Sequence, residues 1–453
     1  MSEWAKDAIF YHIHPLGLCG APERNDGQSP PEPRLDQLGP WVEHARSLGA
    51  TALYLGPVLE SSAHGYDTAD FTQVDRRLGT GADLRRLCDR AHGLGMRVIL
   101  DAVLNHVGRD FWAFRDVRAR GADSPYAGWF RGLRFDRRSP YGDPFAYEGW
   151  SGCYDLVKLE HNNPQVVDHL LGAVARWIAE FDIDGLRVDA AESIDLELLR
   201  RLRAHTTRLR PDFWLMGEVV RGDYRRWANG DALHSVTNYE CFKALYSSHV
   251  DRNYFELACA LERQFGEHGL YRDLWLYNFA DNHDVNRVAS NLSNPAHLYP
   301  LYCLLFTMPG IPSIYYGSEW GITARRSRSD DRPLRPCLDL GRERARGNVE
   351  LASAIGRLAE LRHRSPALRR GRYRQLAVSA EQLAFAREAP EETMIVAVNA
   401  APSPAPLELR LPWCARGELR DVLDPGTSHA VRDGKVTLSA VPSCWARVMR
   451  LER

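Results

Sequence analysis

Short apolar segments alternate with amphipathic ones along the first 365 residues, and this alternation restricts the fold more than any other feature of the chain. Apolar runs of four to six residues are typical of buried strands, and the segments between them have the 3.6-residue period of helices. Such alternation indicates a parallel α/β sheet, and eight strands in this length suit a closed (β/α)8 TIM barrel with insertions. We expect strands at Ala8–Ile13, Ala52–Leu55, Arg97–Leu100, Gly185–Val188, Phe213–Met216, His234–Thr237, Leu274–Tyr277 and Ile311–Tyr315.

The segments between these strands predict helices with one apolar face each. One further uncharged run, Leu298–Ser318, is long enough to suggest a transmembrane helix. Because Pro300, Pro309 and Pro312 interrupt it, we expect a buried helix, a turn and a buried strand instead, and no membrane partner. The predicted helices are Leu35–Leu48, Ala82–Leu94, Pro164–Phe181, Leu196–Leu209 and Tyr254–Phe265.

The alternation ends near residue 370, where the hydrophobic period changes from helical to two. This predicts a separate antiparallel β domain, which we expect to be a β-sandwich. Within the barrel region, an insertion rich in aromatic residues follows His106, and a loop rich in Arg and Asp spans Gly317–Gly347. The expected domains are residues 1–106 with 156–368 (barrel), 107–155 (insertion) and 369–453 (β domain), and the expected C-terminal strands are Tyr373–Val378, Leu383–Arg387, Thr393–Val398, Leu407–Leu411, Lys435–Leu438 and Cys444–Leu451.

Charge and cysteine content exclude several classes of protein. The 58 basic and 59 acidic residues give a net charge of −1, so no basic excess is present to neutralise nucleic-acid phosphates. The nine cysteines are an odd number without a CxxC pair, which is neither a disulfide framework nor a zinc spacing. Together with the acidic Glu3 and Asp7, where a signal peptide would be basic, this predicts a cytoplasmic protein.

Polar residues follow four of the predicted strands directly. In a parallel barrel the carboxyl ends of the strands meet at one rim, where catalytic residues lie. A single Asp there is more often a helix cap or part of an ion pair, and a single His is more often structural. Repetition on four strands of one barrel favours an active site over these alternatives. The four segments are Asp101–His106, Asp184–Asp189, Leu215–Glu218 and Phe279–Asp284.

In this order, the four segments resemble the four signatures of the α-amylase superfamily of glycoside hydrolases. Gly56–Val58, His64–Asp67 and Gly310–Gly317 resemble auxiliary motifs of the same superfamily, and the resemblance extends over nearly the whole chain. It implies a catalytic barrel, with the aromatic insertion as the family's B domain and the β-rich tail as its C domain.

The resemblance also implies the catalytic roles. Asp189 is expected to be the nucleophile of a retaining glycosidase and Glu218 its general acid/base. Asp284 is expected to bind sugar hydroxyls and to stabilise the oxocarbenium-like transition state.

Four further side chains are expected at the same sugar. Arg187 would keep the carboxylate of Asp189 ionised. His106 and His283 would hydrogen-bond hydroxyls, and Tyr66 would offer its ring to the apolar face of the sugar, although core packing explains Tyr66 nearly as well.

The segment Asp155–Glu160 stands where the family's fifth signature lies. Its Lys-Leu core resembles that of neopullulanases and cyclomaltodextrinases, with Glu160 in place of their usual Asn. Ala191–Ser193 lacks the His that helps to build the calcium site of secreted α-amylases, so we expect no metal and no other cofactor. The resemblance implies hydrolysis of α-1,4 bonds in small maltooligosaccharides or cyclic glucans, including cyclic maltosyl-maltose. The resemblance does not decide whether the protein forms a homodimer, which we treat as possible.

Two other functions stay open on the sequence alone. A transglycosylase on the same scaffold, such as a 4-α-glucanotransferase or a trehalose synthase, forms the same glycosyl-enzyme and differs in whether sugar or water attacks it. A non-catalytic binding subunit is the remote alternative, and the presence of all three carboxylates argues against it. A time course of products would separate the three.

Overall fold

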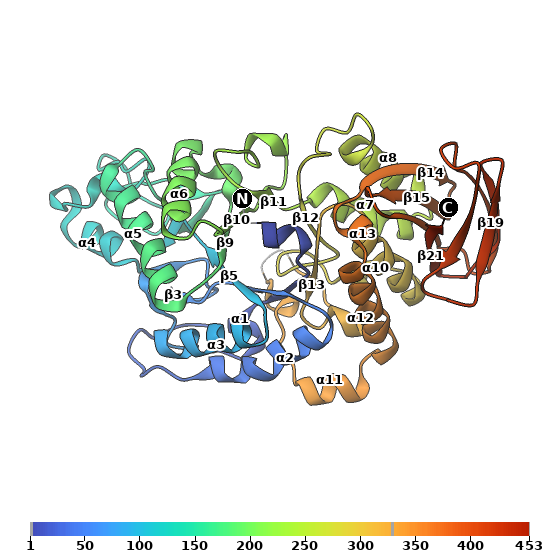
Figure 1. The fold of residues 1–453 in the computed structure, drawn as a ribbon. Helices are drawn as coiled ribbons and strands as arrows, with labels where there is room; N and C mark the ends of the chain where they lie inside the picture. The colour runs from blue at the N-terminus through green and yellow to red at the C-terminus, as the bar shows by residue number, and fades with distance from the viewer. Residues whose placement is uncertain (1–2, 328–329, 453) are drawn as a thin grey trace.

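Eight parallel strands form the barrel that carries the predicted site (Figure 1). The computed structural model describes residues 3–327 and 330–452. The strands pair in the order β11-β10-β9-β5-β2-β1-β13-β12, and a parallel bridge between Thr237 and Tyr277 closes the ring. Seven of the predicted strands are confirmed with small shifts at their ends, whereas β12 begins only at Tyr277, the last residue of the strand predicted there. Their bounds are β1 Phe10–Ile13, β2 Ala52–Leu55, β5 Arg97–Ala102, β9 Gly185–Val188, β10 Trp214–Gly217, β11 Ser235–Val236, β12 Tyr277–Phe279 and β13 Ile311–Tyr315.

Helices surround the barrel, and their ends follow local sequence signals. The third helix begins with a capping box, in which the hydroxyl of Thr80 accepts from the N–H of Asp83 while the Asp83 carboxylate accepts from the N–H of Thr80. The uncharged run at Leu298–Ser318 is a buried helix, a turn and a buried strand, as predicted, and no helix of the described residues is long and apolar enough to cross a membrane. The predicted helices are confirmed. In the first of them, predicted at Leu35–Leu48, the initial turn (Arg34–Leu38) is a 3-10 helix. The α-helices of this region are α1 Pro15–Leu18, α2 Gly39–Ser47, α3 Gly81–Gly93, α5 Pro164–Phe181, α6 Leu196–Leu209, α7 Tyr239–Val250, α8 Tyr254–Phe265, α9 Val288–Asn291, α10 Leu298–Thr307, α11 Leu340–Arg346, α12 Val349–Arg364 and α13 Pro366–Arg370.

The aromatic insertion has a small sheet of its own, which was not predicted. β6 (His106–Gly108) pairs antiparallel with β8 (Cys153–Lys158), and β7 (Gly149–Trp150) pairs with the other edge of β8. On α4 (Trp112–Arg120), Phe114 packs against other aromatic rings of the insertion at centroid distances of 5.0 Å. Aromatic packing therefore supports a segment with little regular backbone.

Two further segments depart from the expectations. A hairpin of β3 (Leu59–Ser61) and β4 (Thr68–Val74), on which no strand was predicted, follows β2. Gly317–Gly347, predicted to be a loop, contains α11 and two short 3-10 helices, Ser318–Trp320 and Arg332–Leu334. Residues 328–329 of this segment lie outside the described residues.

The C-terminal strands form a separate antiparallel sheet at the end of the molecule opposite to α4 (Figure 1). Its eight strands have the order β14-β15-β16-β21-β18-β19-β20-β17, and side chains from both halves of the sheet share one hydrophobic core. Six strands were predicted, and β18 and β19 are additional. The bounds are β14 Arg372–Val378, β15 Gln382–Glu388, β16 Thr393–Asn399, β17 Ala405–Arg410, β18 Arg416–Asp421, β19 Ser428–Arg432, β20 Lys435–Val441 and β21 Trp445–Glu452.

Candidate active site

A buried arginine at the carboxyl end of β9 lies at the centre of the predicted site. Its atom Nη1 donates to Asp189 Oδ1 at 2.8 Å and to Asp101 Oδ1 at 2.8 Å, and its atom Nη2 lies 2.9 Å from Glu218 Oε2. This residue, Arg187, therefore holds three carboxylates that come from β5 and from the ends of β9 and β10. A guanidinium with five donors in a fixed plane suits such a bridge, because it can meet several carboxylates at once.

Asp101 is the member of this cluster to which sequence reasoning gave no role of its own. It is buried, and its Oδ2 accepts from the hydroxyls of Tyr54 at 2.8 Å and Tyr66 at 2.9 Å. Its carboxylate thus ties Arg187 to Tyr66, so it holds other site residues rather than facing open space.

The two carboxylates predicted to do the chemistry lie on either side of Arg187. Burial raises the pKa of Asp189, and the guanidinium of Arg187 opposes that rise. The ion pair is therefore what favours a charged Asp189 in this buried position. Glu218 is held from a second direction, because its Oε2 also accepts from the N–H of Ala190 at 3.1 Å.

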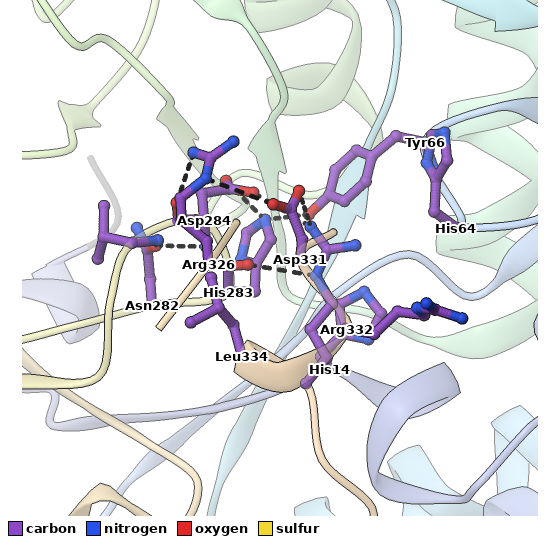
Figure 2. Close-up of polar contacts among 12 residues, drawn as sticks. His14, His64, Tyr66, Asn282, His283, Asp284, Arg326, Asp331, Arg332 and Leu334 are labelled. Atoms are coloured by element: carbon purple, nitrogen blue, oxygen red, sulfur yellow. Dashed lines mark hydrogen bonds and ion pairs between the residues drawn. The ribbon is translucent and has the colours of Figure 1, made fainter. Parts of the chain in front are cut away.

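Asp284 and His283 form a second cluster at the rim, after β12. His283 Nε2 lies 2.9 Å from Asp284 Oδ2, and it also contacts the hydroxyl of Tyr66, whose ring is stacked on the imidazole at 5.4 Å. Figure 2 shows the ring of Tyr66 extending toward this pair. Tyr66 thus links the two clusters through its hydroxyl, with Asp101 on one side and His283 on the other.

Arg335, which sequence reasoning missed, reaches the second cluster from the Gly317–Gly347 segment. Its Nη2 donates to Asp284 Oδ1 at 3.2 Å, and its Nε donates to the carbonyl of His283 at 3.2 Å. Burial acts to raise the pKa of Asp284, but the charges of His283 and Arg335 lower it well below its ordinary value. Asp284 therefore stays ionised at a lower pH than an ordinary aspartate would.

His106 lies on the insertion side of the site, at the start of β6. It is buried, its Nε2 lies 4.0 Å from Asp189 Oδ2, and that nitrogen has no hydrogen-bond partner among the described residues. Burial lowers the pKa of His106 to about 3, so the ring is neutral at ordinary pH. A neutral imidazole with an unpaired nitrogen beside Asp189 is suited to a hydroxyl group of a bound molecule.

The tryptophans of the insertion divide into two groups. Trp150 on β7 is stacked on His106 with ring centroids 5.3 Å apart and an interplanar angle of 26°. Trp112 and Trp129 lie against each other at 5.5 Å and against His169 of α5. Trp150 is therefore the one of the three that borders the site.

The described residues do not fit a calcium ion at the site. Asn105 is buried and its Oδ1 is unpaired, but calcium takes six to eight oxygen ligands and one amide oxygen is far from such a set. In the described part of the chain, the one group of three side chains spaced for a metal is Asp89, His92 and Asp182, near the amino ends of β5 and β9. Its carboxylates already pair with Arg85.

All seven predicted site residues thus lie at the carboxyl rim of the barrel. They form two clusters that Tyr66 joins, and His106 lies beside Asp189 of the first cluster. The site thus contains the buried, ion-paired carboxylate of Asp189, the carboxylate of Glu218 next to it and that of Asp284 in the second cluster. Aromatic rings and imidazoles surround them. This site can hold a polar molecule with many hydroxyl groups and act on it by nucleophilic attack and proton transfer.

Comparisons with known proteins agree with this arrangement. The family model described as alpha amylase, catalytic domain, matches residues 41–367. A cyclomaltodextrinase from Geobacillus thermopakistaniensis is 32% identical over 437 residues, which cover 91% of this chain and 72% of the relative. Neopullulanase 2 from Thermoactinomyces vulgaris is 32% identical over 472 residues, covering 97% of this chain and 77% of the relative.

A solved structure matches along almost the full length. The cyclic α-maltosyl-(1→6)-maltose hydrolase from Arthrobacter globiformis, in complex with cyclic α-maltosyl-(1→6)-maltose, superposes with a TM-score of 0.82 at 26% identity and covers 99% of each chain. The resemblance seen in the motifs is therefore confirmed over the barrel and beyond it, and the chain belongs to the alpha-amylase family.

Proposed function

We propose that the protein is a retaining α-glucoside hydrolase that cleaves α-1,4 bonds in small maltooligosaccharides or cyclic glucans. The observation that carries the proposal is the bridge made by Arg187, which fixes Asp189 and Glu218 within one hydrogen-bonded unit. A retaining hydrolase needs two carboxyl groups in such fixed proximity, one as nucleophile and one as acid and then base.

In the proposed first step, an oxygen of Asp189 attacks the anomeric carbon while Glu218 gives its proton to the glycosidic oxygen. The bond between that carbon and that oxygen breaks, the leaving sugar departs as an alcohol, and a glycosyl-enzyme ester remains. In the second step Glu218 takes a proton from water, whose oxygen attacks the anomeric carbon and releases Asp189. Asp284 stays negative throughout, because the neighbouring positive charges lower its pKa, and it opposes the positive charge that develops on the sugar ring.

The remaining site residues are proposed to bind the sugar. His106 and His283 would hydrogen-bond hydroxyls, and Tyr66 would lie against the sugar ring. Support for small substrates comes from the two segments that reach the rim, because Trp150 of the insertion contacts His106 and Arg335 of the later segment contacts Asp284. Similar proteins are named cyclomaltodextrinase, neopullulanase and cyclic maltosyl-maltose hydrolase, which agrees with small maltooligosaccharides or cyclic glucans as substrates.

The proposal includes three coarser points. The units are residues 1–106 with 156–368, 107–155 and 369–453, which limited proteolysis can test. A cytoplasmic location is supported by a 28% identical relative named intracellular maltogenic amylase from Bacillus subtilis. A homodimer stays a prediction, and light scattering of the purified protein would decide it.

The test is a time course of products from maltotriose, β-cyclodextrin and a cyclic tetrasaccharide, with the anomer of the first product read by proton NMR. We expect α-anomers and a reducing-end yield that matches bond cleavage. Early products longer than the substrate would show a transglycosylase instead, and inverted β-anomers would contradict the role of Asp189. We also expect kcat/KM on maltotriose to maltohexaose to exceed that on soluble starch by about tenfold, or roughly 1.4 kcal/mol; equal rates would show an open cleft.

A further inference from the structure

Glu218 has a second contact besides Arg187, made by a tyrosine that no motif includes. The hydroxyl of Tyr239, the first residue of α7, lies 3.3 Å from Glu218 Oε1 and 3.3 Å from Asn282 Nδ2. Its ring is held by Phe279 at 5.1 Å and Phe242 at 6.0 Å, both at nearly perpendicular angles. The hydroxyl is therefore placed by a packed ring and not by a flexible side chain.

The direction of these hydrogen bonds is determined by Asn282. Its Oδ1 accepts from the N–H groups of Asp284 at 2.8 Å and Val285 at 3.2 Å, so the amide group cannot be turned around. Its Nδ2 consequently donates to the hydroxyl of Tyr239. Since the hydroxyl has one proton and accepts from Asn282, that proton points to Glu218 Oε1.

The two oxygens of Glu218 are thus in different surroundings. Oε2 receives the N–H of Ala190 and the guanidinium of Arg187, both of which can only donate. These two donors occupy both lone pairs of Oε2, whereas Tyr239 occupies only one lone pair of Oε1, so the transferable proton of Glu218 has to be on Oε1. Oε1 is the oxygen that Tyr239 contacts.

We propose that Tyr239 is a positioning residue that holds Oε1 of Glu218 in the orientation from which it delivers its proton. The inference rests on the proposed function, because it assigns the proton donor within that reaction. No bond to Tyr239 forms or breaks; the proton passes from Glu218 Oε1 to the glycosidic oxygen, and the hydroxyl of Tyr239 keeps its own proton. Asn282 donates a hydrogen bond to Tyr239, and Tyr239 donates one to Glu218. The orientation of the acid Glu218 therefore depends on the segment that carries Asn282 and Asp284.

The experiment compares Tyr239→Phe with wild type on two substrates. Maltotriose needs a proton on its leaving oxygen, whereas an α-maltoside with a dinitrophenyl leaving group does not. Because general acid catalysis contributes about a hundredfold or more, we expect kcat/KM of Tyr239→Phe on maltotriose to fall by about tenfold to a hundredfold, mainly in kcat, and that on the aryl maltoside to change by less than about threefold. Tyr246→Phe, the same substitution about two turns further along α7, is the control and should leave both rates unchanged.

A second variant covers the case in which Tyr239→Phe does not fold. Asn282→Asp keeps the oxygen that accepts from the backbone but replaces the donor with an acceptor, so the hydroxyl of Tyr239 would turn its proton away from Glu218. It should show the same difference between the two substrates. Equal losses on both substrates, or an unchanged rate on maltotriose, would overturn the proposal. A wild-type protein that hydrolyses neither substrate would instead remove the proposed function, and this inference with it.

Discussion

The guanidinium of Arg335 lies 3.2 Å from the carboxylate of Asp284, although the two residues come from separate segments after β13 and β12. This contact brings a positive charge to the carboxylate proposed to face the developing charge of the sugar. It also shows that the segment Gly317–Gly347 contributes to the site rather than lying apart from it.

Removal of this charge should change the pH dependence of activity. Asp284 has a pKa below its ordinary value, so it stays ionised as the pH falls. Arg335→Ala removes one of the charges that lower that pKa, so the pKa rises and the acid limb of kcat/KM should move to higher pH. A loss of about tenfold at neutral pH is expected as well. Arg335→Lys should restore part of both effects, and Arg325→Ala, an exposed arginine of the same segment, should change neither; an unshifted acid limb in Arg335→Ala would contradict this account.

The three carboxylates should each be required. Asp189→Asn, Glu218→Gln and Asp284→Asn are expected to lower kcat/KM on maltotriose by several orders of magnitude while circular dichroism stays that of wild type. Glu218→Gln should recover much of its activity on the dinitrophenyl maltoside, because that leaving group needs no proton in the first step. A folded Asp189→Asn variant with a nearly normal rate would rule out its role as nucleophile.

Trp150 and Trp112 should differ in what they affect. Trp150 is stacked on His106 beside the proposed nucleophile Asp189, so Trp150→Ala should lower kcat/KM on maltotriose by about tenfold or more with little change in melting temperature. Trp112 packs within the insertion and on α5, so Trp112→Ala should lower the melting temperature by several degrees and leave kcat nearly unchanged. The reverse pattern would show that the sugar lies on the other side of the insertion.

Chelation should have little effect. Because the described residues around Asn105 do not fit a calcium ion, exhaustive dialysis against a chelator should leave both kcat and the melting temperature within error of the untreated protein. A fall of many degrees that added calcium reverses would show a site formed by the insertion.

Barrel strands such as β2 and β10 could be predicted because each is an apolar run bounded by turn residues. β18 and β19 could not be predicted in this way. Each has one fully buried apolar residue, Leu419 and Val431 respectively, and the polar and charged residues beside it obscure the alternation of apolar and polar positions. Asp189 and Glu218 could be placed at the rim from sequence because each directly follows a barrel strand.

Other site residues depend on tertiary structure that local sequence does not encode. Arg335 stands in a segment with many arginines, and its contact with Asp284 follows from how that segment folds back over the rim. From its sequence, Tyr239 is an ordinary aromatic residue at the start of a helix. Its proposed role follows from the position of its hydroxyl between Glu218, which follows β10, and Asn282, which follows β12. Trp150 differs from Trp112 through the pairing of β7 with β8.

The closure of the barrel between β11 and β12 has a consequence for how the protein responds to its ligand. β11 has two residues, and the backbone joins it to β12 through the bridge of Thr237 with Tyr277 and the N–H of Asn238 on the carbonyl of Tyr277. Side-chain hydrogen bonds add to this junction, among them those from Asn238 to Asn278, from Asn282 to Tyr239 and from Ser235 to the carbonyl of Trp275. A sugar held by Glu218 after β10 and by Asp284 after β12 would act as a further cross-link across this junction, with β11 lying between the two linked strands. Hydrogen exchange at the amides of β11 and β12 should therefore slow more on ligand binding than exchange in β1 and β2. Bound substrate would thus stabilise the closure of the barrel between β11 and β12.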